Sequence, residues 1–143
     1  MGQQQLLLLV LSTVIVGLAT VAGIQAFSEN QQQATQDALV QRAITLGNDV
    51  AAAANKPTQL GGIGTLGSVS TDSDIANAIG IQSLTGIDAD GAGESAACEI
   101  QDANTKTVKC GSNGATSGDV QVSVDVNPGT DDPVTVNNID VTS

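Results

Sequence analysis

The sequence contains no Trp, Tyr or His, a single Phe and two Cys, and it has no ionisable side chain before Glu29. A structural zinc site needs four ligands, so the lack of histidine and of further cysteines argues strongly against one. The same shortages leave few groups for acid–base or nucleophilic chemistry, and we therefore expect neither enzymatic activity nor a cofactor. Only 4 Lys and Arg residues stand against 15 Asp and Glu residues, and the net charge of −11 should repel nucleic acid.

Apolar residues dominate the N-terminal part of the chain from Leu6 to Phe27. A helix rises about 1.5 Å per residue and a bilayer core is about 30 Å thick, so a run of about 20 apolar residues is long enough to span it. A secretory signal peptide would need a basic start and a shorter apolar stretch. The sequence therefore predicts a membrane-length helical segment over residues 1–28.

The helix is expected to continue into an amphipathic segment over residues 29–54. Its apolar residues recur at helical spacing, at Leu39, Ala43, Leu46, Val50 and Ala54. No proline precedes Pro57, which is followed by Gly61 and Gly62, so the helix should end near residue 54. Gly, Ser and Thr are frequent in residues 55–70, which we interpret as a connector.

Residues 71–143 are expected to form a small β-rich head domain. Asp72, Ser73 and Asp74 precede an apolar group that ends at Gly80, which predicts a short helix. Valines then alternate with polar residues from Val120 to Val126, the pattern of a strand with one buried face. In the last strand the alternation changes phase, and a bulge at Asn137-Asn138 would return its apolar residues to a common face.

Cys98 and Cys110 predict a disulfide within a β-hairpin. If the two cysteines lie opposite each other, Ile100 faces Val108 and Glu99 faces Lys109 as an ion pair, and Ala103–Thr105 form a three-residue loop. The apolar partners and the charged partners thus agree on one register. A disulfide also places this domain in an oxidising compartment outside the cytoplasm.

Two segments carry a family resemblance: the uncharged apolar stretch LLLLVLSTVIVGLATVAGIQAF and the amphipathic stretch SENQQQATQDALVQRAITLGNDVAAAA. With the small domain that follows, this organisation resembles that of type IV pilins. The opening GQQQL at residues 2–6, together with Pro57 and LGG at residues 60–62, is similar to a group of bacterial pilin-like proteins. The resemblance implies an α+β fold in which a long N-terminal helix precedes an antiparallel β-rich head.

The resemblance also implies a structural subunit that polymerises through its N-terminal helix into an extracellular filament, with adhesion or architecture as its role. The subunit would be inserted in the inner membrane before assembly, and its partners would be copies of itself and the pilus assembly machinery. The residues expected in the filament core are Leu7, Val10, Val14, Gly17, Val21 and Ile24.

One position departs from the family pattern. Pilins usually carry Glu at the fifth mature position, where it is thought to pair with a neighbour's N-terminal amine. This position is Gln5 if Met1 is the mature N-terminus and Leu6 if Gly2 is. A glutamine side chain can accept a hydrogen bond from an amine but cannot neutralise its charge.

Two other interpretations remain open. The first is a single-span membrane-anchored surface protein that does not polymerise, which would not need an apolar helix face continuing to Ala54. The second concerns Asp88–Glu94, which partly matches a calcium-binding loop ending at Glu99, although Asp90-Gly91 is also a common turn dipeptide. We favour a turn, and we expect this loop to offer a contact surface for adhesion.

Overall fold

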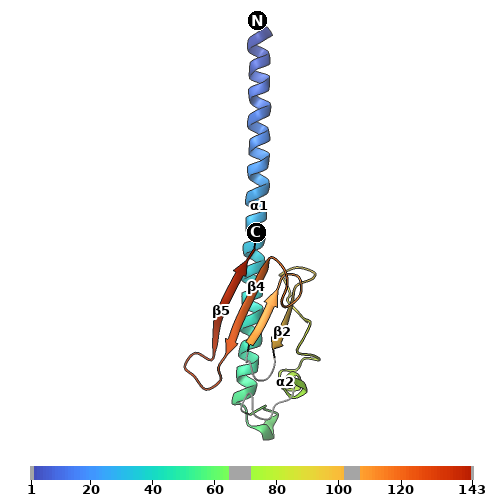
Figure 1. Cartoon of the computed structure of the whole chain (residues 1–143), viewed down its shortest axis with the longest axis vertical. Coiled ribbons are helices and arrows are strands. Elements are labelled where there is room, and N and C mark those ends of the chain that lie inside the picture. The colour runs from blue at the N-terminus through green and yellow to red at the C-terminus, as the bar shows by residue number, and fades with distance from the viewer. Residues whose placement is uncertain (1, 65–71, 102–106, 143) are drawn as a thin grey trace. The chain divides into compact units, whose positions relative to one another are not determined.

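The computed structural model describes residues 2–64, 72–101 and 107–142 of the chain (Figure 1). The predicted hairpin loop at 103–105 therefore lies outside the described residues. The chain divides into two compact units, Met1–Gln33 and Ala34–Ser143. The first unit consists of helix α1 alone in its described residues, and the same helix, which spans Gly2–Asn55, also supplies the first element of the second unit.

The second unit contains one antiparallel sheet with the strands in chain order. The strands are β1 (Ile87–Asp88), β2 (Ala97–Gln101), β3 (Thr107–Gly111), β4 (Val120–Val126) and β5 (Val134–Val141). The short helices are the 3₁₀ helix η1 (Thr58–Leu60) and α2 (Asp72–Ile79). The expected α+β fold is thus confirmed: a long N-terminal helix precedes an antiparallel sheet that contains a disulfide-linked strand pair.

The core of the second unit lies between the C-terminal half of α1 and one face of the sheet (Figure 1). Of the apolar helix face expected from the sequence, Leu39, Ala43, Leu46 and Val50 are buried, and Ala54 packs at the margin of the core. The sheet contributes alternate residues of β2, β3 and β4, all at most 5% exposed: Cys98, Ile100, Val108, Cys110, Val120, Val122, Val124 and Val126. A core of small aliphatic side chains follows directly from the lack of aromatic residues.

Two local predictions from the sequence are confirmed. Helix α2 spans Asp72–Ile79, with Asp72 and Asp74 in its first turn, where carboxylates interact favourably with the helix dipole. It is followed by Gly80, whose φ of 78° lies in the left-handed region that glycine adopts without strain. Strand β5 contains an irregularity at the expected place, because Ser123 pairs with Asn138 while Val124 pairs with Val136.

Gly47 allows α1 to approach the sheet closely. A Cβ atom at this position would lie 3.0 Å from Cγ1 of Val134 and 3.4 Å from Cγ2 of Val126. A glycine inside a helix costs about 1 kcal/mol relative to alanine, so its presence here has a packing reason.

We expect Gly47→Leu to lower the free energy of unfolding by about 1–3 kcal/mol, because the larger side chain overpacks the contact with β4 and β5. Asn48→Leu is the matched control, since Asn48 is the next residue of the helix and is exposed. Amide hydrogen exchange of β4 in the detergent-solubilised protein measures the change in stability in each variant. Equal protection of β4 in the two variants would contradict the packing role of Gly47.

Candidate functional site

The N-terminal half of α1 exposes a large amount of apolar surface. Its large aliphatic and aromatic side chains are between 51% and 71% exposed from Leu6 to Phe27. By length and composition α1 is sufficient to cross a membrane. Isolated exposed apolar residues are common on protein surfaces, but a contiguous apolar surface of this length marks a membrane or protein interaction site.

The exposed apolar surface surrounds the helix. Successive residues of an α-helix are rotated by about 100°, so the four consecutive leucines Leu6–Leu9 point in four directions around the axis. They are 67%, 68%, 63% and 64% exposed. A partner that contacts one side of the helix therefore leaves part of this surface in water.

The residues expected in the filament core fall on one stripe of this helix. Leu7, Val10, Val14, Gly17, Val21 and Ile24 follow one another at spacings of three and four residues, which keeps them within about 100° of the helix circumference. The set omits the opposite side, where Leu8, Ile15 and Val16 are 63%, 58% and 62% exposed. The signal for these additional residues was present in the sequence, since residues 6–27 contain no charged residue and only four scattered polar ones, which do not form a polar face.

The hydroxyl groups in this segment are satisfied within the helix. Ser12, Thr13 and Thr20 donate hydrogen bonds of 2.8 Å to the backbone carbonyl oxygens of Leu9, Val10 and Gly17. A hydroxyl transferred from water to an apolar environment without such a bond costs roughly 1–3 kcal/mol on protein mutational scales. These three residues can therefore face lipid or another helix at low cost.

Two glycines leave shallow places on the helix surface. Apart from neighbouring residues and the backbone of the helix itself, no atom lies within 4 Å of the position that a Cβ would occupy at Gly17 or Gly23. Small residues at such positions allow helices to pack with their backbones close together, and this packing is the main source of helix association in an apolar environment. Both positions are thus available to another helix.

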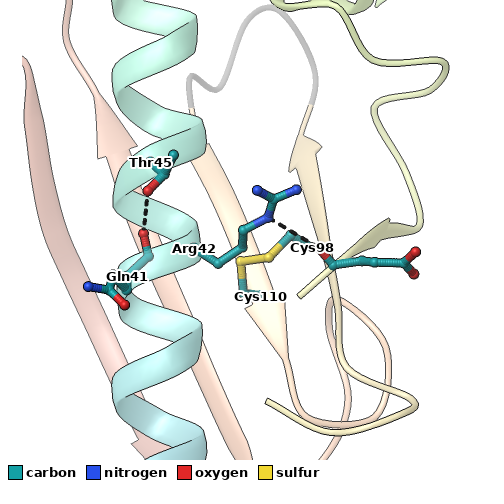
Figure 2. The surroundings of a disulfide bond; sticks show 6 residues. Gln41, Arg42, Thr45, Cys98 and Cys110 are labelled. Atoms are coloured by element: carbon teal, nitrogen blue, oxygen red, sulfur yellow. Dashed lines mark hydrogen bonds between the residues drawn. A yellow bond between two sulfur atoms is a disulfide. The ribbon is translucent and has the colours of Figure 1, made fainter. Parts of the chain in front are cut away.

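The predicted disulfide is confirmed in the second unit. Cys98 and Cys110 are linked (Figure 2) and are both fully buried. They pair across β2 and β3, as do Ile100 and Val108. Glu99 and Lys109 lie opposite each other in the same register. The Glu99 carboxylate accepts a 3.1 Å hydrogen bond from Nε2 of Gln101, and the ion pair with Lys109 stays a prediction.

The segment from Asp88 to Glu94 forms a turn between β1 and β2 rather than a loop between two helices. Backbone hydrogen bonds from Ala92 to Ala89 and from Ala96 to Gly93 close it. It is also fixed to α1, because Nε of Arg42 donates a 3.1 Å hydrogen bond to the carbonyl oxygen of Asp88. In Figure 2 the Arg42 side chain extends from α1 past the disulfide.

No family model, curated protein or solved structure matches the chain.

Proposed function

We propose that the chain is a structural subunit that polymerises through the N-terminal half of α1 into an extracellular filament like a type IV pilus. The observation that carries this proposal is the ring of exposed apolar side chains on a helical segment without ionisable groups. Each large side chain of this kind gains about 1.5–3 kcal/mol when it is removed from water. The segment is therefore expected to act in an environment that removes its apolar side chains from water on all sides.

Two environments cover a helix on all sides: a bilayer, and a bundle of many copies of the same helix. A dimer covers only the stripe that its partner touches, as in a two-stranded coiled coil. A subunit that first enters the membrane and later joins a bundle keeps its apolar surface dry at each stage. The proposal therefore includes both a membrane-inserted precursor and an assembled form, with the assembly machinery moving the subunit between them.

Assembly from the membrane needs a force other than the hydrophobic effect, because leucine and valine gain little when lipid is exchanged for other apolar side chains. Close packing at Gly17 and Gly23 can supply it, since both surfaces are open. The internally bonded hydroxyls of Ser12, Thr13 and Thr20 add no unsatisfied polar group to the bundle. The apolar stripe expected in the filament core includes Gly17.

The second unit suits the outer surface of such a filament. It carries most of the acidic residues of the chain, and its core contains a disulfide, which persists in oxidising environments outside the cytoplasm. Carboxylates on the outside keep a polymer soluble and limit unwanted association. We assign the heads an architectural or adhesive role, in which the turn from Asp88 to Glu94 is one exposed contact surface.

A single-span anchor that does not polymerise is the second candidate, since the length and apolar composition of α1 suit a membrane span equally well. Electron microscopy of material sheared from producing cells separates the two functions. We expect filaments in which this chain is the main component by mass spectrometry. Recovery of the chain only from the membrane fraction, without filaments, would support the anchor and overturn the proposal.

A further inference from the structure

Strand β5 presents an apolar face that the described residues of the second unit cover only in part. Val136, Ile139 and Val141 pair with Val124, Val122 and Val120 of β4, and residues that pair directly point to the same side of a sheet. The three β4 residues are at most 2% exposed, whereas the three β5 residues are 43%, 39% and 44% exposed. The core face of the sheet therefore continues beyond the area that α1 covers.

The position of β5 explains this exposure. It is the edge strand of the sheet, and it lies to one side of α1 in Figure 1. Its first residue, Val134, still reaches the helix at Gly47. Together with Leu60, its three later apolar residues are the exposed large hydrophobic side chains among the described residues of the second unit.

The bulge in β5 favours binding through the side chains on one face of the strand over binding through the backbone groups at its edge. The extra residue at Asn137 returns Val136 and Ile139 to the same side of the sheet. Bulges also disturb the regular row of backbone groups along an edge strand and so discourage pairing with another sheet. A partner of β5 is therefore one that buries side chains rather than one that adds a strand.

The distribution of charge along the chain indicates which of its segments can bind the apolar face of β5. Most of the acidic residues of the chain lie in the second unit, so contact with a second head domain would bring carboxylates towards the apolar face and remove them from water at a cost. Residues 2–27 have no ionisable side chain and expose apolar groups on every side. Contact with this segment therefore buries the face of β5 without removing a charged group from water.

We propose that the apolar face of β5, formed by Val136, Ile139 and Val141, binds the apolar N-terminal half of α1 from a second copy of the chain. This inference rests on the proposed function. Because the pairing partners on β4 are two residues apart, neighbouring side chains in the row are separated by about 7 Å. Residues four apart on a helix are separated by about 6 Å along its axis, so three side chains of each element can interdigitate.

The test compares Ile139→Lys with Asn138→Lys in the full chain, expressed with its assembly machinery. The two positions are adjacent and exposed, but Asn138 pairs with Ser123 and so faces the opposite side of the sheet. We expect Ile139→Lys to lower the yield of sheared filaments by about tenfold or more, because assembly would bury an unpaired ammonium group, and Asn138→Lys to assemble normally. Equal filament yields from the two variants would overturn the inference.

A second measurement tests the contact directly, because Ile139→Lys could also lower the filament yield by destabilising the head domain. A photoactivatable side chain is placed at position 139 or 138, and filaments are formed together with copies labelled with ¹⁵N. We expect position 139 alone to crosslink to residues 6–27 of a labelled copy. Crosslinks from position 139 only to heads, only within one copy, or to no protein would each overturn the inference. If the unsubstituted chain forms no filaments, the proposed function fails instead.

Discussion

Cells that produce the Val14→Asp variant should form no filaments. Val14 is 53% exposed and lies in the middle of the apolar half of α1, on the stripe expected in the filament core. A carboxylate buried there without a partner costs several kcal/mol, and the cost recurs in every subunit of a polymer. Electron microscopy of sheared material, with quantification of the chain in the sheared and membrane fractions, measures the effect.

Val14→Thr provides a matched control for this experiment. Threonine has nearly the shape of valine, and Thr13 and Thr20 show that a hydroxyl in this helix donates to a backbone carbonyl three residues earlier. We therefore expect the threonine variant to form filaments. Normal filaments from the Val14→Asp protein would remove the helix bundle from the proposed function.

Loss of the disulfide should cause the second large effect. We expect the double variant Cys98→Ala, Cys110→Ala to lower the stability of the sheet by about 2–4 kcal/mol, since the link closes a short loop in the unfolded chain and lies in a core of small aliphatic side chains. The chain has no Trp or Tyr to report by fluorescence. Amide hydrogen exchange of β2 and β3 in the detergent-solubilised protein gives the stability of this region directly.

The double variant Cys98→Ser, Cys110→Ser shows how far stability depends on the apolar surroundings of these two positions, in addition to the covalent bond between them. Both positions are 0% exposed, so each serine hydroxyl without a partner adds a cost of about 1–3 kcal/mol. The serine variant should therefore exchange faster than the alanine variant. If the alanine variant exchanges as slowly as the native protein, the disulfide contributes nothing to the stability of the sheet.

Much of the fold follows from local patterns in the sequence, because each of these patterns is consistent with one local structure. Alternation from Val120 to Val126 leaves one face of β4 apolar, and this face is buried. The spacing of Cys98 and Cys110 admits a hairpin register in which apolar and charged pairs both match, and the strands adopt that register. The change of phase in β5 requires a bulge, which appears at the expected residues.

The sequence by itself determined the long helix, the disulfide-linked strands and the uncharged apolar surface, because each depends on residue type and spacing along a single element. Only the tertiary structure decided how far the core extends. The helix covers β2, β3 and β4 but leaves Ile139 on β5 exposed, although Ile139 has the same apolar character as the buried residues. The need for glycine at Gly47 and the hydrogen bond from Arg42 to Asp88 likewise arise from residues distant in the chain. Burial depends on what an element packs against, and that neighbour is not encoded in the element's own pattern.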